Sequence, residues 1–81
     1  MNPPHSLLDV ILISPDAVLY EGKAHSVILP GEKGCFEVLP NHKPLMSRLF
    51  PGEITVDQEV LRVRRGIVKV GFNQVLALVE A

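Results

Sequence analysis

The chain has 81 residues, of which 47% are hydrophobic and 21% are charged, and its formal net charge at pH 7 is −1. This composition excludes a disordered chain, and the near-neutral charge argues against a general binder of polyanions such as nucleic acid. A chain of this length buries only about 60% of its unfolded surface, so we expect one small domain over residues 1–81.

The compartment and the core chemistry follow from a few residue types. A single cysteine, Cys35, cannot form a disulfide within the chain, which favours a reducing compartment. No apolar run reaches the length of a membrane helix, and the first residues lack the basic start and cleavage site of a signal peptide. Because aromatic residues are few and tryptophan is absent, the core must come from Val, Ile and Leu, which favours a sheet.

Short apolar runs alternate with turn signals along the chain. In chain order the runs are LLDVILIS (7–14), AVLYEG (17–22), HSVILP (25–30), CFEVLP (35–40), LMSRLFPG (45–52), EITVD (53–57), VLRVRRG (60–66), IVKVG (67–71) and VLALVE (75–80). Their spacing is close to the roughly eight- to twelve-residue rhythm of sandwiches and barrels. Pro and Gly recur too often for a long helix. The sequence therefore predicts an all-β fold, a small β-sandwich of about nine to ten short strands.

The pattern within the runs predicts which faces are buried. In EITVD, VLRV and IVKV, apolar and polar residues alternate, which predicts strands with one core face and one wet face. LLDVILIS and VLALVE are apolar on both faces apart from Asp9. Such strands are covered on both sides or leave an apolar patch for a partner. VDQEV (56–60) predicts a hairpin turn between two strands.

The segment GEKGCFEVLPNHKPL (31–45) places Cys35, Glu37 and His42 close together, as a catalytic site would. A cysteine nucleophile needs an adjacent base and an oxyanion site. Cys35 and Glu37 share one face of a predicted strand, but a Pro-Asn pair breaks that strand before His42. We interpret these residues as a small residue beside a turn, an exposed Glu and a turn His, and we expect no enzyme activity.

Metal and phosphate sites are not predicted. The candidate metal ligands lie on separate elements without paired spacing, and they are His5, His25, Cys35 and His42. GEKG (31–34) lacks the Gly-Lys-Ser/Thr ending of a phosphate loop and the helix that would follow it. We therefore expect neither a metal nor a cofactor.

The basic run RVRR (62–65) places Arg62 and Arg64 on the outward face of one predicted strand. Such a pair could contact phosphates, as on oligonucleotide-binding barrels. Binders of single strands also need stacking aromatic residues, and none flank this run. We interpret it as a solvated strand face opposite Asp57, Glu59 and other acidic side chains, and we expect no nucleic-acid partner.

The order of turn residues and strands in three segments resembles that of one known family. GEKGCFEVLPNHKPLMSRLFPGEI (31–54) contains a glycine turn, a short strand, Leu-Pro-x-His-x-Pro-Leu and a Pro-Gly turn. This order is similar to the N-terminal β-sandwich of the ε subunit of F-type ATP synthase, called δ in mitochondria. LDVILISPDAVLYEGKAHSVILPG (8–31) and GIVKVGFNQVLALVEA (66–81) resemble the family's opening and closing strands. The resemblance runs in register from Leu8 to Ala81, allowing small gaps.

The resemblance implies a structural part of a rotor. It implies a non-catalytic subunit of the central stalk, which turns as proton or sodium flow drives ATP synthesis on the cytoplasmic side of a bacterial inner membrane. One face would pack on the γ subunit, and loops at one end would meet the membrane c-ring. By motif position the ring-facing residues are Glu32, Lys33, Gly34 and Cys35, with His42 near that end. The γ-facing residues are Ser14, Met46 and Ser47.

Two departures from the family pattern bear on these expectations. Many members have Gly at the position of Glu37, and many continue into a C-terminal helical hairpin that inhibits ATP hydrolysis or binds ATP. Because the chain ends at its last predicted strand, the resemblance does not imply that regulatory role. Met1 and the absence of a tag favour a naturally short chain over a fragment. The alternative functions are a stand-alone β-sandwich adaptor with another partner and, less favoured, an enzyme using Cys35 or His42.

Overall fold

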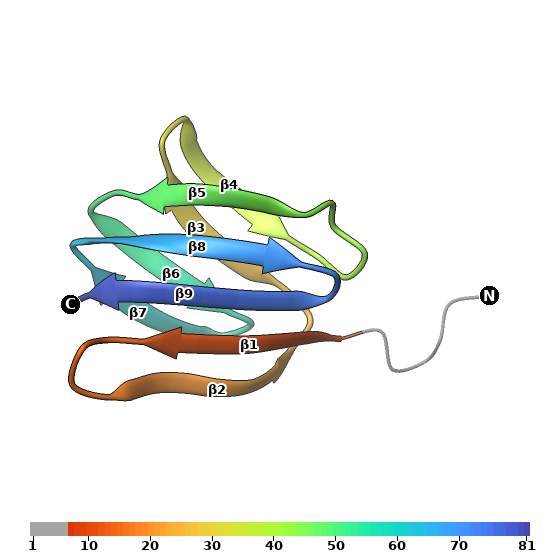
Figure 1. The fold of residues 1–81 in the computed structure, drawn as a ribbon, viewed down its shortest axis with the longest axis horizontal. Coiled ribbons are helices and arrows are strands. Elements are labelled where there is room, and N and C mark those ends of the chain that lie inside the picture. The colour runs from red at the N-terminus through yellow and green to blue at the C-terminus, as the bar shows by residue number, and fades with distance from the viewer. Residues whose placement is uncertain (1–6) are drawn as a thin grey trace.

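The computed structural model describes residues 7–81, and these form nine β-strands that match the nine apolar runs in order (Figure 1). The strands are β1 (Leu8–Ile13), β2 (Val18–Ala24), β3 (Val27–Gly31), β4 (Gly34–Val38), β5 (Leu45–Leu49), β6 (Gly52–Val56), β7 (Glu59–Val63), β8 (Arg65–Gly71) and β9 (Gln74–Glu80). The predicted all-β sandwich is confirmed. Residues 7–81 contain no helix that is long and apolar enough to cross a membrane. His5 lies outside the described residues.

Two sheets pack face to face (Figure 1). The front sheet has five strands in the order β2-β1-β9-β8-β5, and the rear sheet has four in the order β4-β3-β6-β7. β1 and β9 pair in parallel, whereas the other neighbouring strands pair antiparallel. The first and last strands therefore lie side by side inside the larger sheet.

The core lies between the sheets and consists of aliphatic side chains. Along β9, Val75, Ala77 and Val79 are buried while Leu76 and Leu78 point outward, as the two-residue period of a strand requires. The predicted alternation is confirmed in β6, β7 and β8. The buried residues are Leu8, Val10, Leu12, Ala24, Val27, Leu29, Val38, Leu49, Ile54, Val56, Val63, Val68, Val70, Val75, Ala77 and Val79. Residues 7–81 bury no polar or charged side chain, so the core supplies packing rather than chemistry.

Two hairpins have two-residue loops with a polar residue in the left-handed region. Asp57 has φ 53° in the β6–β7 loop, and Asn73 has φ 52° in the β8–β9 loop. Asp and Asn tolerate this region better than other residues with side chains, because their short polar groups can hydrogen-bond locally. The hairpin predicted at VDQEV is confirmed, since Val56 and Glu59 pair across its loop.

The Asp57 side chain ties the β6–β7 hairpin to the corner between β2 and β3. Its carboxylate accepts hydrogen bonds from the backbone N–H groups of His25 (2.9 Å) and Ser26 (3.1 Å). His25 Nδ1 lies 3.7 Å from Asp57 Oδ2. Desolvation raises the pKa of Asp57, but the hydrogen bonds and the His25 charge outweigh it and hold that pKa below its ordinary value of 3.8.

Replacing Asp57 by Asn is expected to lower the melting temperature by several degrees at pH 5, because a neutral amide oxygen is a weaker acceptor for the two N–H donors. A carboxylate with a depressed pKa stabilises the fold above its unfolded-state pKa, and this stabilisation is lost as pH falls through the native pKa. The difference from wild type should therefore shrink between pH 5 and pH 2.5. Thermal melts of Asp57→Asn and of Glu59→Gln, a control in the same hairpin, measure it. A difference that grows on acidification would contradict the prediction.

Candidate interaction surfaces

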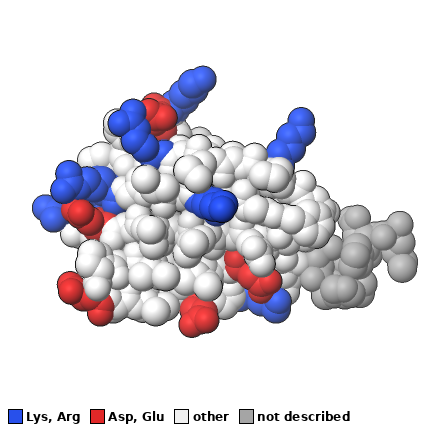
Figure 2. Space-filling view, viewed as in Figure 1, with Lys and Arg blue, Asp and Glu red and all other residues white. Residues whose placement is uncertain are grey.

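The exposed side of the five-stranded sheet, which we call the outer face, is largely apolar at its centre. The strand register aligns its central side chains in two rows, Ile13–Leu78–Ile67–Arg48 and Ile11–Leu76–Lys69–Met46. The pairs Asp9–Gln74 and Arg65–Glu80 lie on the same side of the sheet, beyond these rows at either end. Met46 is 67% exposed, Leu78 55% and Ile67 48%. Figure 2 shows this side of the molecule, where charged groups stand mainly at the margins and uncharged atoms cover most of the area between them. Of the two alternatives given for the first and last strands, the isolated chain shows the apolar patch, with Leu76 and Leu78 exposed on β9.

The exposed side of the four-stranded sheet is mixed in polarity. Glu37 pairs with Ile28 across β4 and β3, and Thr55 pairs with Val60 across β6 and β7. Arg62 forms an ion pair with Glu53 at 3.5 Å. The exposure predicted for Glu37 is confirmed. The two faces therefore differ in the way expected of a domain that docks through one sheet.

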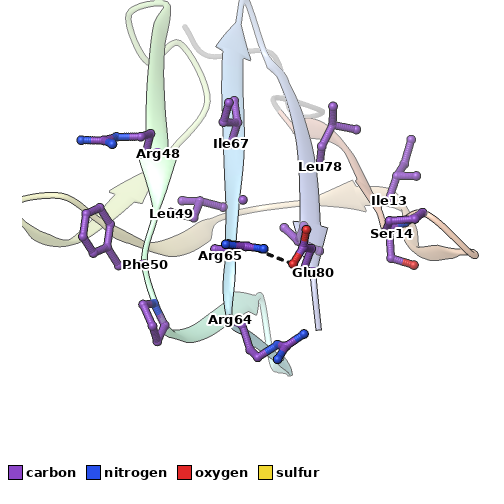
Figure 3. Close-up of a pocket in the computed structure, with 14 residues that line it drawn as sticks. Ile13, Ser14, Arg48, Leu49, Phe50, Arg64, Arg65, Ile67, Leu78 and Glu80 are labelled. Carbon is purple, nitrogen blue, oxygen red and sulfur yellow. Dashed lines mark hydrogen bonds and ion pairs between the residues drawn. The ribbon is translucent and has the colours of Figure 1, made fainter.

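A groove of about 870 Å³ deepens one end of the outer face (Figure 3). Its apolar lining includes Ile13, Ile67, Leu78 and Phe50. Its charged lining residues are Arg48, Arg64, Arg65 and Glu80. Arg65 Nε donates to Glu80 Oε1 at 2.9 Å, and Arg48 Nη2 donates to Glu32 Oε2 at 2.5 Å. The groove thus combines an apolar lining with a charged rim.

The structure separates the two arginines that the sequence placed on one strand face. β7 ends at Val63, and the backbone N–H of Arg64 donates to the carbonyl oxygen of Glu80 at 2.7 Å. The chain therefore crosses from the four-stranded to the five-stranded sheet at Arg64. Arg62 remains on the outside of the first sheet opposite Glu53, and Arg64 lines the groove on the second. The prediction of a shared face was wrong, because strand alternation cannot reveal where a chain changes sheets.

The residues predicted to face the c-ring fall at two ends of the sandwich. Glu32 and Lys33 form the β3–β4 turn, and Gly34 and Cys35 begin β4. His42 follows the opposite end of β4, and a strand advances about 3.3 Å per residue, so the prediction that His42 lies near the turn was wrong. The loop with His42 is instead tied to the β8–β9 turn, where the Asn41 N–H donates to Asn73 Oδ1 at 2.6 Å.

Cys35 and His42 are not brought together, for the same reason. Cys35 is exposed on the outside of the four-stranded sheet, opposite Pro30. His42 lies at the end of the turn that follows β4, and its backbone N–H donates to the Leu39 carbonyl oxygen at 3.1 Å. Residues 7–81 contain no group of three His, Cys, Asp or Glu side chains that could hold a metal ion. Cys35 and His42 therefore lie in separate parts of the described structure and do not form one site.

The residues predicted to face γ are also distributed. Met46 projects from the outer face, whereas Ser47 points to the other side of β5 and donates from Oγ to the Arg48 carbonyl at 2.9 Å. Ser14 lines the groove, and its Oγ accepts from the Ala17 N–H at 3.2 Å in the turn after β1. Met46 and Ser14 thus share the outer side of the sheet, and Ser47 does not.

The groove is the feature that sequence reasoning missed. Its lining comes from the ends of β1, β5, β8 and β9, which are far apart in the chain. Arg64 and Arg65, which follow β7, are a local sequence signal for the charged part of the groove. The residues that surround them are set by the pairing of strands that are distant in the chain, which the sequence does not reveal. The apolar periodicity indicates that β1 and β9 carry outward apolar residues without indicating that they are adjacent.

Gly34 allows the tight β3–β4 turn because its φ is +112°. A Cβ at this position would meet no atom within 4 Å, so only backbone strain opposes a side chain. We expect Gly34→Ala to cost about 1–2 kcal/mol of unfolding free energy. Gly22→Ala, whose Cβ would meet Tyr20 at an ordinary 3.6 Å, is the control. Equal urea midpoints for the two variants would refute this account of the turn.

Comparison with known proteins identifies a family. The family model of the ATP synthase delta/epsilon chain beta-sandwich domain matches residues 7–81. The ATP synthase epsilon chain of Leptospira interrogans is 38% identical over 77 residues, covering 90% of this chain and 61% of the relative. That of Maricaulis maris is 44% identical over 66 residues, covering 82% and 49%. The chain therefore spans about half to three fifths of the length of these curated relatives.

Solved structures share the fold. One chain of the Euglena gracilis mitochondrial ATP synthase, from a structure of OSCP, F1 and the c-ring, aligns with TM-score 0.86 and 18% identity over 100% of this chain and 54% of its own length. A chain from the central stalk and c-ring of the Tetrahymena thermophila enzyme gives TM-score 0.77 and 15% identity over 91% and 63%. Because the family model covers all the described residues, the chain belongs to the ATP synthase delta/epsilon chain family and carries its beta-sandwich domain.

Proposed function

We propose that this domain is a non-catalytic element of an F-type ATP synthase rotor, joining the γ subunit to the c-ring and taking part in coupling ion flow to ATP synthesis. It would work at the cytoplasmic side of a bacterial inner membrane, held there through the complex. Family membership and the names of the relatives support the proposal. The observation that carries it furthest is the contrast between an apolar outer face and a mixed opposite face.

The outer face is the proposed contact with γ. A joint that transmits torque needs a well-packed interface with an apolar centre and a polar rim. Ile67 and Leu78 are direct neighbours at the middle of the face, whereas Arg48 and Glu80 lie toward its margin. Of the three residues that the sequence predicts to face γ, Ser14 and Met46 belong to this proposed contact. Ser47 points to the other side of β5, so γ would contact it only by extending around the edge of that strand.

The β3–β4 turn is the proposed contact with the c-ring. Its residues Glu32, Lys33, Gly34 and Cys35 are all exposed. The Glu32–Arg48 ion pair connects the turn to β5, so the turn is held against the sheet that carries the outer face. Loops at one end of a rigid sandwich can vary to suit a partner without disturbing the core.

Calorimetric titration of the protein with γ from the same organism tests the proposal. We expect a saturable complex of defined stoichiometry. Absence of binding between the two purified proteins would refute the γ contact. The second candidate, an adaptor with a different partner, is supported by the apolar face alone. A pull-down from native membranes that recovers another protein and no ATP synthase subunit would favour it.

A further inference from the structure

Within the described part of the chain, the groove at the end of the outer face contains one guanidinium without a counter-charge. Arg65 is paired with Glu80, and Arg48 is paired with Glu32. Among residues 7–81, no carboxylate lies within ion-pair distance of the Arg64 side chain. Figure 3 shows Arg64 below the Arg65–Glu80 pair and apart from it. Among the described lining residues, Arg64 is therefore the arginine that remains available to bind an anionic group of a partner.

The rest of the groove is suited to aliphatic side chains. Ile13, Ile67 and Leu78 come from three adjacent strands and form one continuous apolar row. Phe50, 44% exposed, stands on the Arg48 side, where the guanidinium carbon lies 5.9 Å from its ring centroid. A partner that fills this space removes water from the apolar row and from Arg64 together.

Burial of an unpaired cation is costly, so a partner that covers the groove must supply an acceptor. A carboxylate matches the planar fork of a guanidinium with two parallel hydrogen bonds. We propose that the groove receives a segment of γ that presents an aliphatic side chain to the row of Ile13, Ile67 and Leu78 and a carboxylate to Arg64. This inference rests on the proposed function and adds the chemistry of the contacting segment.

A nucleic acid is the competing ligand for an exposed arginine. It needs several cations along its backbone and aromatic side chains on which bases stack. In the groove, Arg48 and Arg65 are already paired with carboxylates, and among residues 7–81 Phe50 is the single aromatic lining residue. A phosphate backbone also has no apolar groups that could pack against the row of Ile13, Ile67 and Leu78. A peptide segment with one acidic residue therefore fits the groove better.

Carbodiimide coupling tests the proposed carboxylate directly, because it joins lysine amines to carboxylates and leaves arginine unreacted. The Arg64→Lys variant is mixed with purified γ, treated with carbodiimide and digested, and cross-linked peptides are identified by mass spectrometry. We expect a link from position 64 to one Asp or Glu of γ. Arg62→Lys, two residues away on the other sheet, is the matched control and should give no such link.

Affinity provides the second measurement. We expect Arg64→Gln to weaken γ binding about tenfold or more and to reduce its salt dependence, while Arg62→Gln stays within about twofold of wild type. Melting temperatures of both variants check that each is folded. If wild type binds γ but Arg64→Gln binds equally well and no link forms at position 64, the inference fails and the proposed function stands. If wild type does not bind γ, both fail. Binding of a labelled single-stranded oligonucleotide that is lost in Arg64→Gln would also overturn the inference.

Discussion

Gly66→Ala is expected to lower the unfolding free energy by about 2–3 kcal/mol, a large fraction of the stability of so small a domain. A Cβ at this position would lie 2.4 Å from the Leu78 carbonyl oxygen and 3.0 Å from the Val79 Cα. Both are backbone atoms of β9, the strand paired with β8 through Gly66 and Val79. The clash cannot be relieved by rotating a side chain, so it must distort the pairing of the two strands.

Gly71→Ala is the matched control for this prediction. Gly71 ends the same strand, and its Cβ would approach only the Gln74 Oε1 atom, at 3.9 Å. Urea unfolding of both variants should show a much lower midpoint for Gly66→Ala and a midpoint near wild type for Gly71→Ala. Two variants with similar midpoints would show that the close approach of β8 and β9 does not constrain position 66.

The second large effect is expected at the centre of the outer face. Leu78→Asp should weaken binding to γ about a hundredfold, because an aliphatic contact in the interface is replaced by a charged group that must lose its water. Leu78 is 55% exposed in the isolated domain, so the same change should alter the melting temperature little. Calorimetric titration with γ measures the affinity, and thermal melts establish that the variant is folded.

Val60→Asp separates a specific face from a general effect of added charge. Val60 is also 55% exposed and also lies on a strand, but it faces outward from the four-stranded sheet. We expect this variant to bind γ like wild type. If Val60→Asp lost affinity and Leu78→Asp kept it, the assignment of the docking face would have to be reversed.

The strands could be predicted from the sequence because the signals for them are local. Alternation in EITVD and IVKV reports burial along one strand, and the residues that end a strand sit within the same run. Nine runs therefore became nine strands. The hairpin at Asp57 was equally local, since a two-residue loop between paired strands depends on neighbours in the chain.

The arrangement of the surfaces depended on contacts between distant residues. His42 was grouped with the β3–β4 turn because the two are close in sequence, yet β4 carries the chain away from that turn. Arg64 was grouped with Arg62 because alternation was extended past Val63, where the chain changes sheets. The groove requires the register of β1 with β9 and of β8 with β5, which no single run contains.

The parallel pairing of β1 with β9 also determines when the larger sheet can fold during synthesis. β9 lies between β1 and β8, so the larger sheet has no continuous centre until residues 74–80 have left the ribosome. Until then the buried side of β1, with Leu8, Val10 and Leu12, has only β2 as a sheet neighbour. Closing a contact across nearly the whole chain is slow, and an unpaired apolar strand edge invites association. The larger sheet is therefore completed only by the last of the nine strands, and β1 keeps an open edge for most of the chain's synthesis.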